Sequence, residues 1–175
     1  RNASFVLAES PIAYEQVRRH FPGTAASLIP VCLWRDELEA VETDWGIERF
    51  NPVRKPVILY VGRVTPRKGI HDLISAFATL ANTYPEWSIE IRGPVEDADY
   101  FNDLQIQAAD LGLASRVRFA PPLSGEELYR RYRSSSIFCL PSTGEGMPTV
   151  ITEAMYFGGA IVAGMSGAVP YQLDD

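Results

Sequence analysis

The sequence predicts an α/β fold, namely a Rossmann-like doubly wound parallel sheet with helices on both faces. From residue 57 onward, short apolar runs alternate with stretches of helical apolar spacing, and the strand–helix–strand order repeats four times. Such alternation is typical of parallel sheets, in which helices connect successive strands. The strands are almost continuously apolar, which favours burial on both faces of the sheet over exposure of one face.

Five strands are predicted in this part of the chain, at residues 57–62, 87–93, 116–120, 136–140 and 160–164. Apolar residues with helical spacing occupy the intervals between the strands. Gly112 stands where the second of these helices should end. Ser124, with Glu127 three residues later, predicts a capping box at the start of the third helix.

The pattern divides the chain into three parts. Residues 1–34 show one strand, a helix and a second strand. Residues 35–56 are acidic and polar, as expected of a linker with a short helix, and residues 57–175 make up the doubly wound domain. Because Arg1 is not an initiator residue, we expect this chain to be a piece of a longer protein.

Composition argues against several classes of function. The formal net charge of −6 does not favour binding of nucleic acid or of an anionic membrane through the overall field. No apolar run approaches the ~18 residues of a membrane span, and no signal peptide is recognised. Cys32 and Cys139 lie far apart without a CxxC motif, so we expect neither a disulfide framework nor a metal site. These features predict an intracellular protein.

Two loops are the strongest candidates for a ligand site. In the common strand order 3-2-1-4-5, the first and fourth strands are neighbours, and ligands bind beyond their carboxyl ends. The loop after the first strand reads GRVTPRKG, residues 62–69, and the loop after the fourth reads PSTGEGMPT, residues 141–149. Both loops are rich in glycine and in charge. We therefore expect them to form one binding site together.

The first loop supplies cations. Gly62 permits close backbone approach, and Arg63 and Lys68 flank a turn at Pro66. Arginine offers a planar fork to phosphate oxygens, and lysine offers a mobile point charge. The pattern is neither GxGxxG nor a Walker A motif, so a dinucleotide-binding fold and a P-loop ATPase are not favoured. A solvated basic turn is the alternative for this loop taken alone.

The second loop supplies a helix start and two carboxylates. Pro148 suits the first position of a helix, and the N-terminal amides of a helix attract anions. Together with Arg63 and Lys68, this helix start could hold a diphosphate without a metal. Carboxylates accept hydrogen bonds from hydroxyl groups, so Glu145 could bind a sugar and Glu153 a ribose diol. The alternative for Glu153 is an exposed helix residue, although the apolar residues that follow it count against this.

These residues resemble those of a known family. The segment that runs from GRVTPRKG to the two glutamates and the following Ala154-Met155 is similar to the C-terminal, donor-binding domain of the family 4 (group 1) retaining glycosyltransferases. These enzymes have two Rossmann-like domains in the GT-B arrangement. The resemblance covers residues 55–175, and residues 1–34 resemble the end of the family's N-terminal, acceptor domain. It implies a cytoplasmic enzyme of polysaccharide or glycolipid biosynthesis, which can contact the inner membrane peripherally in its full-length form.

The resemblance also implies a role for each site residue. It assigns the donor diphosphate to Gly62, Arg63, Lys68, Met147, Pro148, Thr149 and Val150, the donor sugar to Glu145, Gly146 and Met147, and the ribose to Glu153. Arg63, Lys68 and Glu145 would be the catalytic residues, the two cations stabilising the departing diphosphate. The implied donor is a UDP-, GDP- or ADP-linked sugar, transferred with retention of configuration to a carbohydrate or lipid-linked acceptor. No metal or other cofactor is implied.

Other features of the reaction stay open. Gly93, Ala120 and Leu123, at the ends of the second and third strands, are expected to line the nucleobase pocket, whose apolar walls accept any base. Met165, Ala168 and Tyr171 stand where the family often has Asp, Gly and Glu, which leaves the donor sugar undetermined.

The chain ends where a further helix and a sixth strand are expected, so we expect this piece to bind donor without catalysing transfer. A nucleotide-sugar epimerase on the same scaffold and a non-catalytic nucleotide-sugar-binding module are the alternatives.

Overall fold

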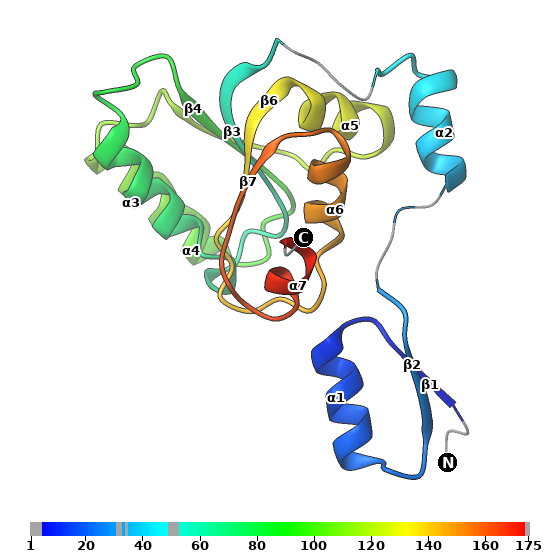
Figure 1. Ribbon diagram of the computed structural model, residues 1–175. Helices are drawn as coiled ribbons and strands as arrows, with labels where there is room; N and C mark the ends of the chain where they lie inside the picture. The colour runs from blue at the N-terminus through cyan, green and yellow to red at the C-terminus, as the bar shows by residue number, and fades with distance from the viewer. Residues whose placement is uncertain (1–4, 31–32, 34, 49–52, 174–175) are drawn as a thin grey trace.

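The computed structural model describes residues 5–30, 33, 35–48 and 53–173. Its main body is a five-stranded parallel sheet in the order β5-β4-β3-β6-β7 (Figure 1). This is the common 3-2-1-4-5 order on which the choice of the two loops depends. Every strand begins and ends within two residues of its predicted position. The strands are β3 Lys55–Val61, β4 Ser88–Arg92, β5 Val117–Ala120, β6 Ser135–Leu140 and β7 Ala160–Ala163.

Helices cover both faces of this sheet, as predicted. Figure 1 shows α3 and α4 on one side and α5 and α6 on the other. The connections switch sides between β3 and β6, which pair directly with each other. The reversal of strand order, where ligands bind in this type of sheet, therefore lies at the carboxyl ends of these two strands. The elements are η1 Pro66–Lys68, α3 Ile70–Leu80, α4 Ala98–Asp110, α5 Gly125–Ser134, α6 Thr149–Tyr156 and α7 Val169–Leu173.

The core extends into the segment predicted to be a linker. Its short helix is present as α2 Arg35–Thr43, but Val41 and Ile47 are completely buried within the main hydrophobic cluster. The ring of Trp45 lies 5.7 Å from that of Tyr129 on α5. A polar, acidic composition did not predict this packing, because the three apolar residues are spread along the segment. Residues 49–52 of the predicted linker lie outside the described residues, as does Cys32 of the cysteine prediction.

The N-terminal part forms a small unit of its own. It consists of β1 Phe5–Ala8, α1 Pro11–His20 and β2 Ala25–Leu28, which matches the predicted strand, helix and strand. The two strands pair in parallel, as a helix-connected pair must. Figure 1 shows α1 beginning near the end of the main body that carries α7.

Two predicted helix starts differ from the structure. Ser124 is the N-cap of α5, but in the described part of the chain its side chain makes no capping hydrogen bond. Gly125, the first residue of α5, has a φ of +53°, which differs from the right-handed helical value at the position next to the cap. Pro148 is the N-cap of α6 rather than its first residue, because the helix begins at Thr149.

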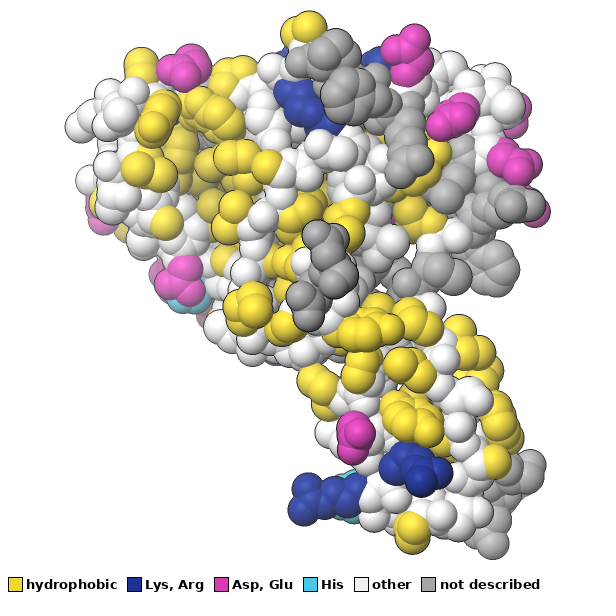
Figure 2. Space-filling view, in the orientation of Figure 1, with side chains coloured by type: hydrophobic (Ala, Val, Ile, Leu, Met, Phe, Trp, Pro, Cys, Tyr) yellow, Lys and Arg dark blue, Asp and Glu magenta, His cyan; other side chains and the backbone are white. Residues whose placement is uncertain are grey.

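An apolar groove lies near the amino-terminal ends of the strands, away from the carboxyl ends where the order of the strands reverses. It has a volume of 290 Å³, and Figure 2 shows hydrophobic side chains gathered on this face. Its lining residues are Ile58, Phe77, Leu80, Tyr84, Trp87 and Ile137. Among the residues described, no helix is both long and apolar enough to cross a bilayer.

We expect the stability of the fold to fall from pH 9 to pH 11 because of Cys139 on β6. Burial raises the pKa of its thiol from 9.0 to about 11. A raised pKa in the folded state gives stability that is present below the unfolded value and is lost as the pH rises toward the folded value. The loss should be about 2 kcal/mol over this range. Urea unfolding of the wild-type chain and of Cys139→Ala should show a shallower pH dependence for the variant, and equal slopes would contradict the assignment.

Candidate functional site

The two loops that follow β3 and β6, where the strand order reverses, pack directly on each other. Gly69 has a φ of +66°, and a Cβ at this position would lie 2.3 Å from the carbonyl oxygen of Pro141. The amide of Thr143 donates to the carbonyl of Arg67 at 3.1 Å. The Arg67 guanidinium in turn donates to the carbonyl of Gly144 at 2.5 Å. The loops after β3 and β6 therefore form one continuous surface.

Lys68 and Glu145 meet at this junction. Lys68 Nζ and Glu145 Oε1 lie 2.5 Å apart, and the two side chains are only 10% and 9% exposed. In a buried pair of this kind, mutual attraction opposes the cost of removing both charges from water, and removal of one partner leaves the other uncompensated. The sequence assigned these residues to different parts of a ligand, whereas the structure holds them in contact.

Arg63 has a different environment from Lys68, although both belong to the same loop. Its side chain is 51% exposed and lies 3.2 Å from Glu96, which follows β4. Exposed ion pairs of this type contribute little to stability. Arg63 can therefore exchange Glu96 for a ligand anion at small cost. The structure thus provides one fixed cation in Lys68 and one adaptable cation in Arg63.

A buried tyrosine and a close backbone contact hold the start of the loop after β3. The hydroxyl of Tyr60 donates to the carbonyl of Arg63 at 2.7 Å. The pKa of Tyr60 is raised above its ordinary value, first by burial and then by the negative charge of Glu145. The phenol consequently stays neutral and keeps its donor. Gly93 lies so near that a Cβ on it would stand 1.8 Å from the carbonyl oxygen of Gly62, so the ends of β3 and β4 touch through their backbones.

The start of α6 is held by α7 and by the turn before it. Ala168 donates its amide to the carbonyl of Gly146 at 2.8 Å. The side chain of Gln172 donates to the carbonyl of Pro148 at 3.2 Å. Gly146 and Thr149 are exposed, and the intervening Met147 and Pro148, together with Val150, are half-buried. The amide end of α6 is thus fixed beside the Lys68–Glu145 pair, where an anion would gain from the helix dipole.

Glu153 lies on α6 and is half-buried rather than exposed. The hydroxyl of Tyr132, at the end of α5, donates to its Oε2 at 2.7 Å. The pKa of Tyr132 is raised, first by burial and then by the charge of Glu153, so the phenol remains a donor. This hydrogen bond orients the carboxylate.

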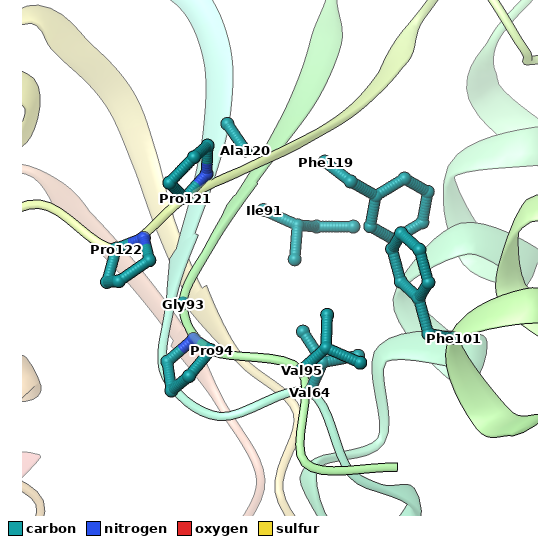
Figure 3. A pocket seen from close by; sticks show the side chains of 10 residues that line it. All are labelled: Val64, Ile91, Gly93, Pro94, Val95, Phe101, Phe119, Ala120, Pro121 and Pro122. Atoms are coloured by element: carbon teal, nitrogen blue, oxygen red, sulfur yellow. The ribbon is translucent and has the colours of Figure 1, made fainter. Parts of the chain in front are cut away.

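An apolar pocket of 350 Å³ opens at the ends of β4 and β5 (Figure 3). Gly93 and Ala120, two of the three residues predicted to line a nucleobase pocket, line it together with prolines and two phenylalanine rings. The rings of Phe101 and Phe119 pack edge to face with their centroids 5.1 Å apart. Leu123 does not line this pocket but lies in a separate cleft of 510 Å³ along α5, which is rich in arginine. The structure therefore separates Leu123 from the other two residues.

Sequence reasoning missed three residues that hold the site. Arg67 could have been suspected, because it stands next to Lys68 in the basic turn. Tyr60 and Tyr132 gave no signal, because an aromatic residue within an apolar strand or helix pattern is normally a core residue. Their hydroxyl groups become part of the site only through tertiary packing.

The sequence of this chain is similar to a family of transferases. The family model described as "Glycosyl transferases group 1" matches residues 44–175. A GDP-mannose-dependent alpha-(1-6)-phosphatidylinositol monomannoside mannosyltransferase of Mycolicibacterium smegmatis is 33% identical over 130 residues, which are 70% of this chain and 33% of that protein. An uncharacterized glycosyltransferase of Haemophilus influenzae is 41% identical over 115 residues, which are 66% and 31% of the two chains. The chain thus spans about a third of the length of these relatives.

Solved structures confirm the fold. The Anabaena protein HepE, solved in complex with UDP, matches 99% of this chain and 48% of its own with a TM-score of 0.76 and 22% identity. Sucrose-phosphate synthase from Thermosynechococcus elongatus matches 98% of this chain and 43% of its own with a TM-score of 0.75 and 24% identity. At this level of identity, the likeness concerns the doubly wound fold.

Proposed function

The chain belongs to the group 1 glycosyl transferases, and we propose that it is the donor-binding part of an enzyme that transfers a sugar from a nucleoside-diphosphate sugar to a carbohydrate or lipid-linked acceptor. The observation that carries this proposal is the 2.5 Å contact between Lys68, in the loop after β3, and Glu145, in the loop that leads into α6. A cation, helix amides and a carboxylate meet there, which suits a diphosphate joined to a polyhydroxylated ring.

In the proposed reaction, the bond between the anomeric carbon of the sugar and the diphosphate oxygen breaks, and the acceptor hydroxyl takes the place of the diphosphate with retention of configuration. Negative charge grows on the leaving diphosphate. Lys68, Arg63 and the amides of Met147, Thr149 and Val150 would stabilise that charge, without need of a metal. Because Lys68 is already held by Glu145, it needs little reorganisation as the charge develops.

The remaining groups would bind the rest of the donor. Glu145 and Gly146 would contact the sugar, and Glu153, oriented by Tyr132, would accept hydrogen bonds from the ribose hydroxyls. The apolar pocket beside Gly93 would suit a nucleobase. One relative is named as GDP-mannose-dependent, and one structural neighbour was solved with UDP, which supports a nucleotide-linked donor.

Thermal unfolding of this chain with UDP, GDP and ADP tests the proposal. A ligand present at about a hundred times its dissociation constant should add about 2.7 kcal/mol of stability. For a domain of this size, that corresponds to an upward shift of several degrees. We expect one of the three nucleotides to give this shift equally in EDTA and in magnesium. No shift with any of them would contradict the proposal.

Two variants identify the ribose contact. Glu153→Gln keeps an oxygen that can accept a hydrogen bond from Tyr132 but loses the negative charge that favours the ribose hydroxyls. It should therefore weaken binding of the nucleotide that stabilises the wild type by about tenfold. Tyr132→Phe keeps the carboxylate and removes only its orienting bond, so it should weaken binding less. If the wild type and Glu153→Gln bound the nucleotide equally well, Glu153 would not be part of the binding site.

A further inference from the structure

The carboxyl ends of the two parallel sheets face each other across a crevice. On one side, β1 ends at Ala8 and leads through Glu9 into α1. On the other side stand the loops that follow β6 and β7. The crevice has a volume of 190 Å³, and Figure 1 shows the two units approaching at this point. Its lining residues are Glu9, Ser10, Ile12, Ala13, Gln16, Glu145, Gly146 and Gly167.

Glu9 is the charged group on the N-terminal wall of this crevice. Its Oε1 would lie 3.1 Å from a Cβ placed on Gly146, so its carboxylate reaches the loop that carries Glu145. The Glu9 residue is exposed, and among the described residues its carboxylate has no hydrogen-bond or ion-pair partner. Ser10, by contrast, is buried, and its hydroxyl accepts from the amide of Ala13 at 3.2 Å. Glu9 therefore remains available to a ligand, whereas Ser10 is committed to the helix.

The size and chemistry of the crevice indicate what it holds. Sites for drug-sized ligands usually measure ~300–1,000 Å³, so 190 Å³ suits one sugar ring rather than a complete nucleotide sugar. The charge of Glu145 is balanced by Lys68, but that of Glu9 is not. An uncompensated carboxylate repels phosphate and accepts hydrogen bonds from hydroxyl groups.

We propose that Glu9 is a specificity-determining residue, which accepts hydrogen bonds from hydroxyl groups of the transferred sugar on the side opposite Glu145. The inference rests on the proposed function, because it places the sugar of the donor between these two carboxylates. The nucleotide is then bound by the main body alone, whereas the sugar contacts both the main body and the N-terminal unit. Glu9 thus acts on the sugar and leaves the binding of the free nucleoside diphosphate unchanged.

Calorimetric binding to the complete 175-residue chain tests this division. The probes are UDP and GDP, each compared with UDP-glucose and GDP-mannose. For the nucleotide sugar that the wild type binds best, Glu9→Gln and Glu9→Ala are expected to lower the affinity by about tenfold. For the matching nucleoside diphosphate, they should lower the affinity by less than about twofold. Both variants change an exposed side chain, so folding is not at risk.

Glu15→Gln is the matched control. It makes the same charge change on an exposed residue of α1 that does not line the crevice, and it should change neither affinity. If the Glu9 variants lost affinity equally for the diphosphate and for the nucleotide sugar, the inference would be overturned. Unchanged affinity for both ligands would overturn it as well. A wild-type chain that binds no diphosphate would overturn the proposed function together with the inference. Normal diphosphate binding without an effect on the sugar would overturn the inference alone.

Discussion

Replacing Lys68 with Met is expected to lower the free energy of unfolding by about 3 kcal/mol and to weaken nucleotide binding by about a hundredfold. The stability effect follows from the burial of the pair, since Glu145 is left without its cation at 9% side-chain exposure. The binding effect has two causes. The diphosphate loses a charge-assisted hydrogen bond, and the uncompensated carboxylate then repels it. Urea unfolding and calorimetric titration with the nucleotide that binds the wild type measure the two effects separately.

A double variant separates stability from binding. Lys68→Met combined with Glu145→Gln removes both charges, so it should regain most of the lost stability. Nucleotide binding should stay weak, because the cation is still missing. Lys55→Met is the matched control, since Lys55 is an exposed residue at the other end of β3. An unchanged nucleotide affinity in Lys68→Met would exclude Lys68 from the diphosphate site, and an unchanged stability would contradict the buried ion pair.

Gly69→Ala should destabilise the protein far more than the same change at Gly112. Both glycines have a left-handed backbone, with φ of +66° and +71°, so both variants incur the strain of an L-residue in this region, about 1 kcal/mol. At Gly112 the added Cβ meets no atom within 4 Å, whereas at Gly69 it stands 2.3 Å from the carbonyl oxygen of Pro141. The backbone of Pro141 must then move, which should cost a further ~1–3 kcal/mol.

The same pair of variants tests how the loops are joined. Moving Pro141 displaces the loop that carries Glu145, so Gly69→Ala should also weaken nucleotide binding by about tenfold or more. Gly112→Ala should bind the nucleotide as the wild type does, because Gly112 lies at the end of α4. Urea unfolding and calorimetry on both proteins check the prediction. Equal destabilisation by the two variants would show that the contact with Pro141 does not constrain the loops.

Much of the architecture could be predicted because it depends on local pattern. The apolar runs of β3 and β6 are continuous in the sequence, and helices of regular period separate the strands, so a doubly wound parallel sheet follows from general rules. The common strand order of such sheets, 3-2-1-4-5, then places β3 beside β6. The choice of the two loops that leave β3 and β6 follows in turn from that topology. Even the end of α4 was predicted, because Gly112 adopts the left-handed conformation that its position requires.

The sequence by itself thus determined the parallel sheet and its strands, and, with the common strand order, the two loops of the candidate site. Tertiary structure alone decided how their side chains meet, because these contacts join residues far apart in the chain. Lys68 and Glu145 are paired only because β3 and β6 are neighbours, and nothing near either residue in the sequence indicates the partner. The same reason applies to the bond between Tyr132 and Glu153, and to the crevice that brings Glu9 to the loop of Glu145. Local periodicity specifies which face of an element is buried, whereas the identity of the residue that meets it is a property of the assembled fold.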